Sequence, residues 1–453
     1  MRIGAQKWQK NYWLSFMVIS LFLTIYLIII GYPIINWDSQ RYLRGALFFQ
    51  TCPFALTSVC YLFHPLVAIT GAWGFAIIQI ILLAYVTVSS SQFFHKSFIV
   101  GLIAIIMSAA AYYAISVMMD IYTAAGLLVL FLILNGNKNI FLYITLSLCF
   151  LAHYENIPLF LLSAVAYWII FHRKKISSAL ISIIITFIIS IISVVLTGYL
   201  KGDDFIFFSK ARYAMTVPRL MADYPDAARS YMKKYPDSYI GKHKEFYEFA
   251  LTAGEPSHAL LWGDWQGEKG LGYQPVDDNL FKETRSFIVY VLSNYKRELL
   301  KNTLKNTCRF LLWPGYEPGL NTHRAAIKQC VGDLLPGQLK SALNSLPYKS
   351  NEEQFPIRLK ALYGLCYYAS FPVILLFIFL SFINRKIKNL EYYPFVVFAA
   401  IVILVNALLM SNVIETSLRY QLRIMLLPCL AMNLIVADLL KRHFANKGFL
   451  NNG

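Results

Sequence analysis

Long apolar runs constrain this chain more than any other feature, because a helix needs about 20 apolar residues to cross the hydrocarbon core of a bilayer. The first such run covers residues 12–32, and several more follow along the 453 residues. Charged residues make up 14% of the sequence, against about 25% in soluble domains. The sequence therefore predicts an all-α polytopic membrane protein.

Ten spans are expected from these runs. They cover residues 12–32, 66–94, 98–117, 121–135, 139–153, 157–172, 176–199, 359–383, 392–411 and 420–440. Basic clusters precede the first span and follow the second, fourth, sixth, eighth and tenth. Basic residues collect in cytoplasmic loops. The pattern is consistent if both termini are cytoplasmic, and it explains much of the net charge of +17 without a nucleic-acid partner.

The segment between the seventh and eighth spans has a different composition. Residues 201–356 mix acids, bases, aromatic residues and turn formers, which indicates a small, mainly helical domain. The predicted organisation is thus a membrane part over residues 1–200, an insert over 201–356, and a second membrane part with a cytoplasmic tail over 357–453. By parity, the insert faces outward.

Polar residues gather at the outer ends of the predicted spans. Asp38 lies on the first outer loop, Asp120 on the second, and His153 and Glu155 on the third. Ionisable groups at the membrane are costly and often functional. Asp38 is a candidate general base, although Asp38 and Asp120 have an alternative role as helix N-caps. The His153–Glu155 pair suits proton transfer or substrate binding and is too small by itself to indicate a metal site.

Arginines form a second set of candidates at the outer side. The last span opens with "RYQLR", in which Arg419, Tyr420, Gln421 and Arg423 are candidate ligands for an anion. Arginine binds phosphate in a bidentate manner, although Arg and Tyr also anchor helices at the interface. Arg41 lies three residues after Asp38. The chain contains none of the glycine-rich nucleotide-binding motifs, so nucleotide chemistry has no support.

These motifs resemble those of the GT-C superfamily of integral membrane glycosyltransferases, which includes protein mannosyltransferases and aminoarabinose transferases. "INWDSQRYL" is similar to the acidic motif of the first outer loop, and "MMDIYTA" to that of the second. "AHYENIPL" resembles a further polar motif, and "RYQLRIMLLP" the arginine-bearing motif of the last span. The architectural likeness covers most of the chain, although each motif is short.

The resemblance implies an inverting transfer of a sugar from a polyprenyl-phosphate carrier to an acceptor hydroxyl on a glycan, lipid or protein. Asp38 and Asp120 would be catalytic. Arg41, His153, Glu155 and the last-span motif would bind substrate or lipid phosphate. No cofactor is implied with certainty, and a divalent metal is left open. The expected location is the inner membrane of a bacterium, with the site facing outward.

Two other function classes fit the same pattern. A polysaccharide polymerase or ligase would share the lipid donor, the spans and the outer arginines. A transporter or flippase would use the same acids as a proton relay, although they lie at span ends rather than at mid-span. Separately, Cys308 and Cys330 in the insert are as consistent with free thiols as with a disulfide.

Overall fold

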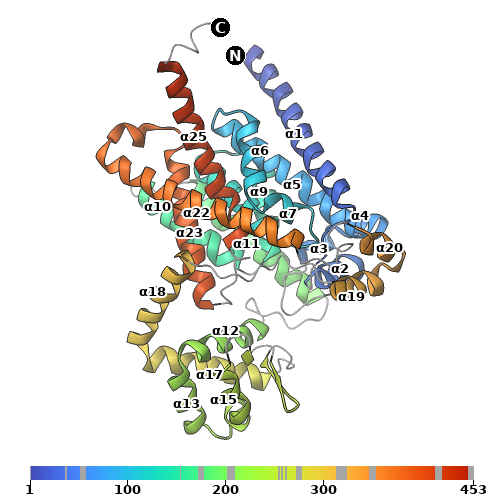
Figure 1. The fold of residues 1–453 in the computed structure, drawn as a ribbon, viewed down its shortest axis with the longest axis vertical. Helices are drawn as coiled ribbons and strands as arrows, with labels where there is room; N and C mark the ends of the chain where they lie inside the picture. Colours follow the sequence, from blue (N-terminus) through green and yellow to red (C-terminus); the bar gives the residue numbers. More distant parts are fainter. Residues whose placement is uncertain are drawn as a thin grey trace. The chain divides into compact units, whose positions relative to one another are not determined.

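The computed structural model describes residues 2–35, 38–50, 58–153, 155–171, 178–200, 210–253, 256, 259–260, 263–271, 278–312, 324–345, 354–413 and 421–446. The described chain is almost entirely helical, as the sequence predicts (Figure 1). It divides into two compact units. Unit 1 comprises Met1–Val194, Glu317–Ile403 and Gln421–Gly453, and unit 2 comprises Val195–Tyr316 and Leu404–Tyr420.

Unit 1 is built from apolar helices joined by short polar breaks. Its helices are α1 (Arg2–Ile30), α2 (Ser39–Phe48), α3 (Ser58–Tyr61), α4 (His64–Thr70), α5 (Ala72–Phe93), α6 (Phe98–Met107), α7 (Ala110–Ala114), α8 (Ile121–Leu134), α9 (Ile140–Ala152), α10 (Asn156–Phe171), α19 (Arg324–Leu334), η2 (Pro336–Gln338), α20 (Leu339–Leu343), α22 (Gln354–Ile383), η3 (Arg385–Asn389) and α25 (Leu426–Asn446). Two further helices, α11 (Ser178–Leu200) and α23 (Tyr393–Val413), begin in unit 1 and end in unit 2.

The ten predicted spans coincide with helices of this set, but their lengths differ. Among the described residues, four helices are long and apolar enough to cross a membrane: Asn11–Ile30, Ala72–Phe93, Ala361–Ile383 and Tyr393–Asn412. Five shorter apolar helices contain 10–17 residues. The break between α9 and α10 confirms the predicted pair of short helices with His153 and Glu155 at the turn. A membrane protein is therefore supported, and the number of crossings stays a prediction.

The predicted run over residues 66–94 is interrupted at Gly71. The backbone of Gly71 has φ +62°, a conformation that residues with a Cβ atom rarely adopt. A Cβ at this position would lie 2.3 Å from Nε2 of Gln338, which donates to the Thr70 carbonyl at 3.0 Å. Gln338 also accepts a hydrogen bond from Tyr32 at 2.7 Å. The glycine thus separates α4 from α5 and lets the α19–α20 segment pack close to the end of α1.

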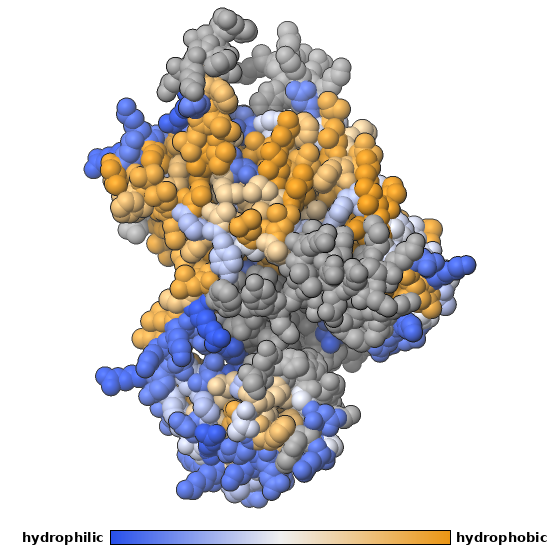
Figure 2. All heavy atoms as spheres, viewed as in Figure 1, coloured by the Kyte–Doolittle hydropathy of each residue, from blue (hydrophilic) through white to orange (hydrophobic). Residues whose placement is uncertain are grey.

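The surface of unit 1 is largely apolar. Large hydrophobic side chains are exposed along the helices, among them Trp13, Leu14, Leu21, Ile25, Ile28 and Ile29 of α1, Ile184, Ile188 and Ile192 of α11, and Phe379, Phe382 and Ile383 of α22. Figure 2 shows the broad hydrophobic surface that such side chains form. Contiguous apolar surface of this kind marks contact with lipid or protein, and the run lengths favour lipid.

Unit 2 has the opposite arrangement. Its described elements are α12 (Lys210–Asp223), α13 (Pro225–Lys234), α14 (Tyr239–Lys242), α15 (Lys244–Leu251), the two-residue strands β1 (Asp264–Trp265) and β2 (Glu268–Lys269), α17 (Asp278–Asn294) and α18 (Lys296–Leu312). The buried faces of these amphipathic helices form an apolar core that includes Met221, Tyr231, Phe246, Phe287 and Val291. Tyr295 separates the two longest helices of this group, α17 and α18.

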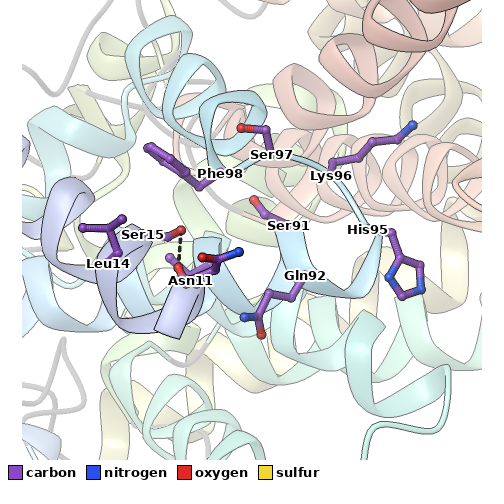
Figure 3. A pocket seen from close by; sticks show the side chains of 10 residues that line it. Asn11, Leu14, Ser15, Ser91, Gln92, His95, Lys96, Ser97 and Phe98 are labelled. Carbon is purple, nitrogen blue, oxygen red and sulfur yellow. Dashed lines mark hydrogen bonds between the residues drawn. The ribbon is translucent and has the colours of Figure 1, made fainter. Parts of the chain in front are cut away.

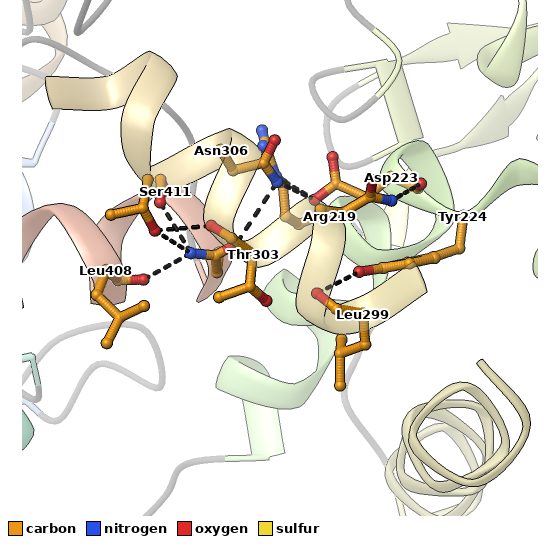
Figure 4. Close-up of polar contacts among 11 residues, drawn as sticks. Arg219, Asp223, Tyr224, Leu299, Thr303, Asn306, Leu408 and Ser411 are labelled. Atoms are coloured by element: carbon orange, nitrogen blue, oxygen red, sulfur yellow. Dashed lines mark hydrogen bonds and ion pairs between the residues drawn. The ribbon is translucent and has the colours of Figure 1, made fainter. Parts of the chain in front are cut away.

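A polar network ties three helices of unit 2 together (Figure 4). Asp223, at the end of α12, accepts hydrogen bonds from Nε of Arg219 at 3.0 Å and from Asn306 of α18 at 2.9 Å. Asn412, near the end of α23, donates to Thr307 of α18 at 3.3 Å. Burial raises the pKa of the Asp223 carboxyl above its usual value, and Arg219 opposes the shift.

Candidate functional site

Backbone hydrogen bonds join the two segments of unit 1 that were predicted to form the first and second outer loops. The Ile34 N–H donates to the Ile115 carbonyl at 3.0 Å, and the Val117 N–H donates to the Ile34 carbonyl at 2.8 Å, forming a short parallel bridge. Ser39 Oγ adds a third link, donating to the Val117 carbonyl at 2.9 Å. The chain preceding Asp38 is thereby fixed against the chain that leads to Asp120.

Asp38 occupies the N-cap position of α2 but does not act as a cap. Its backbone is helical, with φ −72° and ψ −18°, and its side chain makes no capping hydrogen bond. The carboxylate instead pairs with Arg41, with 3.1 Å between Oδ1 and Nη1. The Asp38 side chain is 30% exposed. The carboxylate is therefore held by an arginine one turn away and is still accessible to another molecule.

Asp120 precedes α8 and is completely buried. It also stands at an N-cap position with helical dihedrals and no capping hydrogen bond, so the alternative role as a side-chain cap is wrong for both acids. Gln79 of α5, which is also buried, donates from Nε2 to the Met118 carbonyl. This contact fixes the short segment that carries Asp120 against the long apolar helix α5.

The third loop contributes a buried pair. Nδ1 of His153 lies 3.5 Å from Oε2 of Glu155, and both residues are 8% exposed. The ring of Tyr42, on α2, meets the His153 ring edge-on with 6.4 Å between centroids. The helix that begins after Asp38 therefore packs directly on the His153 turn.

Thr123 and Asn156 connect the second and third loops. Thr123, in the first turn of α8, donates from Oγ1 to Oδ1 of Asn156 at 2.8 Å, and Asn156 Nδ2 donates to the Cys149 carbonyl at 2.8 Å. Both residues are fully buried. The loops of Asp38, Asp120 and the His153–Glu155 pair thus form one connected assembly at one end of unit 1.

Arg423 is the largest of the fully buried side chains, at 1% exposure. It lies in a turn in which the Ile424 N–H donates to the Gln421 carbonyl at 3.1 Å, and α25 begins three residues later at Leu426. The last helix therefore starts later than the predicted residue 420. Cys429, in the first turn of α25, approaches the Met107 carbonyl at 3.7 Å, beside the end of α6.

This contact places the Arg423 end of α25 beside the end of α6, from which the chain continues through α7 to Asp120. Gln421 is also fully buried. The other two candidates of this motif, Arg419 and Tyr420, lie outside the described residues.

Sequence reasoning did not identify the residues that hold this assembly together. Ser39, Tyr42, Gln79, Thr123 and Asn156 serve this role through the contacts given above. The only available signal was their polarity within apolar stretches, which is clearest for Gln79 in "FAIIQIILL". In the described part of the chain, no group of three or more His, Cys, Asp or Glu side chains is placed to hold a metal ion.

The cysteines proposed for a disulfide are both free thiols. Cys308 is exposed on α18, whereas Cys330 is buried in α19. Burial raises the pKa of the Cys330 thiol to about 12, against an opposing effect of Arg44. The Cys330 thiol is therefore unreactive at neutral pH.

The chain has no match among protein-family models, curated proteins or solved structures.

Proposed function

We propose that this protein is a membrane glycosyltransferase that moves a sugar from a polyprenyl-phosphate carrier to an acceptor hydroxyl at the extracytoplasmic face. The observation that carries this proposal is the assembly of three loops with acidic residues at one end of the apolar unit. The backbone bridge of Ile34 to Ser116 and the Thr123–Asn156 hydrogen bond join these loops. The reactive phosphate of a lipid-linked donor lies at headgroup depth, where such an assembly would meet it.

Asp38 is the preferred general base in this mechanism. The acceptor O–H transfers its proton to the Asp38 carboxylate while its oxygen attacks the anomeric carbon of the sugar. The bond between that carbon and the phosphate oxygen breaks, and the polyprenyl phosphate leaves. The configuration at the anomeric carbon of the transferred sugar is thereby inverted. Asp38 is partly exposed and can reach an acceptor, whereas Asp120 is enclosed. Arg41 orients the carboxylate through their ion pair.

Arg423 would stabilise the negative charge that develops on the departing phosphate. A guanidinium held in a dry, rigid environment stabilises such charge more effectively than one in water. The 1% exposure of Arg423 provides this environment. Asp120 and the His153–Glu155 pair are buried, so they would act on the donor sugar through their charge and by fixing the loops around it.

A polymerase or ligase that transfers a whole glycan from a lipid pyrophosphate is the second candidate. It would use the same base and arginine chemistry. A transporter is the third candidate, and the burial of Asp120, His153 and Glu155 is the observation in its favour. A transporter would move a lipid-linked sugar across the bilayer without forming a new glycosidic bond, so product analysis separates it from both transferases.

Lipid analysis of a strain that lacks the protein tests the proposal. Loss of a transferase should cause one polyprenyl-phosphate monosaccharide to accumulate, and restoring the protein should remove it. Accumulation of a lipid-pyrophosphate oligosaccharide would favour the polymerase or ligase. An unchanged lipid pool would contradict all lipid-donor mechanisms.

The ten-span topology, with cytoplasmic termini and an outward insert in a bacterial inner membrane, belongs to the same proposal. The start of α1 and the end of α25 lie at the same end of unit 1 (Figure 1), which supports it. Single cysteines at positions 226 and 386 test it in a background that lacks reactive native thiols. Position 226 should react with an impermeant thiol reagent from outside and position 386 should not. Labelling of both from one side would contradict ten spans.

A further inference from the structure

A pocket of about 500 Å³ lies in unit 1 where α1 meets the turn between α5 and α6 (Figure 3). Its lining residues are Asn11, Leu14, Ser15, Val88, Ser91, Gln92, His95, Lys96, Ser97 and Phe98. Asn11, His95 and Ser97 are exposed, so the pocket reaches the surface. None of these residues belongs to the loop assembly around Asp38.

The position of the pocket along α1 corresponds to the edge of a bilayer. Trp13, two residues after Asn11, is 59% exposed, and Tyr12 meets its ring edge-on. Exposed Trp and Tyr side chains collect at the boundary between headgroups and hydrocarbon. In the sequence, Lys7 and Lys10 precede Asn11. The pocket is therefore expected at headgroup depth on the cytoplasmic side, the side opposite the proposed transfer site.

The lining is suited to a phosphate group. Ser91 lines the pocket and is 4% exposed, and its Oγ has no hydrogen-bond partner in the part of the chain that the structure describes (Figure 3). The amides of Asn11 and Gln92 face the same space from α1 and α5 (Figure 3). Hydroxyl and amide groups can donate to phosphate oxygens.

The charge and the apolar walls point to a lipid. Lys96 and His95 lie on the rim, and none of the ten lining residues is acidic. The Lys96 ammonium extends away from Asn11 in Figure 3, but its long flexible stem allows it to turn toward a bound anion. Leu14, Val88 and Phe98 supply apolar wall that would contact the start of an acyl chain. Basic pockets between cytoplasmic helix ends bind anionic headgroups.

We propose that this pocket binds the phosphate headgroup of an anionic phospholipid from the cytoplasmic leaflet, separately from the lipid-linked sugar donor. Ser91, Gln92 and Asn11 donate to the phosphate, and Lys96 neutralises its charge. The bound lipid would link the first turns of α1 to the α5–α6 turn. This inference rests on the proposed membrane topology and not on glycosyl transfer.

Native mass spectrometry of the full-length protein with phosphatidylglycerol tests the assignment. Wild-type protein should retain one tightly bound phosphatidylglycerol, and Lys96→Gln should weaken that binding about fivefold, the effect expected for one basic residue at an anionic lipid surface. Ser91→Ala should also weaken it, because its small side chain leaves the packing intact while removing the buried donor. The control is Lys386→Gln, which removes an exposed basic residue outside the pocket.

Two further probes identify the source of the phosphate. Phosphatidylcholine should bind more weakly than phosphatidylglycerol, and glycerol phosphate without acyl chains should not compete at equal concentration. Equal competition by glycerol phosphate would mean that the pocket takes a soluble anion and would overturn the lipid assignment. Equal phosphatidylglycerol binding by wild type, Lys96→Gln and Ser91→Ala would overturn the site itself. The site would also be overturned if Lys386→Gln weakened phosphatidylglycerol binding as much as Lys96→Gln does.

Discussion

Units 1 and 2 distribute polar and apolar side chains in opposite ways. Unit 1 exposes long stretches of Ile, Leu and Phe, yet it buries Asp120, His153, Glu155 and Arg423. In the described part of unit 2, the charged side chains are all at least partly exposed, and the interior is a cluster of apolar and tyrosine side chains. Unit 2 is thus organised as a protein that folds in water.

The difference is the reason for placing the proposed site in unit 1. Burial of apolar groups stabilises unit 2 directly, whereas the exposed apolar surface of unit 1 suits a lipid environment. Ionisable groups inside a membrane unit are costly and usually serve function. Substitutions of buried residues should therefore reduce stability in unit 2 and activity in unit 1.

The largest expected effect is on the stability of unit 2. Phe287 is fully buried and meets Tyr231 with 5.1 Å between ring centroids. Phe287→Ala should destabilise unit 2 by about 3–5 kcal/mol, because it removes buried surface and leaves a cavity. Pulse proteolysis across a urea gradient should show this as earlier cleavage within residues 210–312. Val289→Ala, at a side chain that is 53% exposed, is the control and should change little.

Two carboxylates provide the next comparison. Asp120→Asn keeps the shape of a buried side chain in unit 1 but removes the carboxylate charge beside the proposed donor site, so it should reduce sugar transfer by at least about 100-fold. Asp223→Asn makes the same change in unit 2 and should leave the transfer rate near that of wild type. Transfer assays on both variants, after checking their amounts in the membrane, measure the difference. Equal rates for the two variants would remove the functional distinction between the units.

Arg423 is expected to have a somewhat smaller effect. Arg423→Ala should weaken use of the lipid donor about 10- to 150-fold, because one charge-assisted contact contributes about 1.5–3 kcal/mol. Arg442→Ala is the control, since this arginine is exposed at the other end of α25 and pairs with Asp438 at 2.9 Å. Apparent donor affinity in membranes distinguishes them, and an unaffected affinity in Arg423→Ala would contradict the phosphate role.

The smallest effect concerns pH. Burial raises the pKa of Asp223 in the folded protein, so folding favours the protonated form. The contribution of Asp223 to stability is therefore greatest below its unfolded pKa and falls as the pH rises through the folded value. The urea midpoint of wild-type unit 2, compared with that of Asp223→Asn, should decrease modestly between pH 4 and pH 7. A difference that increases over this range would contradict the assigned direction.

Periodicity and apolar length predicted most of the helices. The short pair α9 and α10 was predictable because a single helix over residues 139–172 would be far longer than the bilayer is thick. The break at Gly71 was not, because it depends on packing of Gln338, which is 267 residues away in the sequence. Apolar length alone does not distinguish a continuous span from two helices that meet at a glycine.

The acidic residues of the candidate site could be predicted from the sequence, but the hydrogen bonds that join its loops could not. Asp38 and Asp120 are conspicuous in sequence because they interrupt apolar runs. The bridge between Ile34 and Ser116 uses backbone groups, so it has no side-chain signature. The sequence also could not decide whether Asp38 caps α2, because this depends on its backbone dihedrals and on its pairing with Arg41.

The rate of sugar transfer by Asp38→Asn tests the central claim most directly. The donor is the polyprenyl-phosphate sugar that accumulates in the strain lacking the protein, and the variant is compared with wild type in membranes. Asparagine retains the size and hydrogen-bonding capacity of the side chain but cannot accept the acceptor proton. The account predicts normal donor binding and at least about a 100-fold loss of transfer. Transfer near the wild-type rate would contradict it and show that Asp38 is not the base.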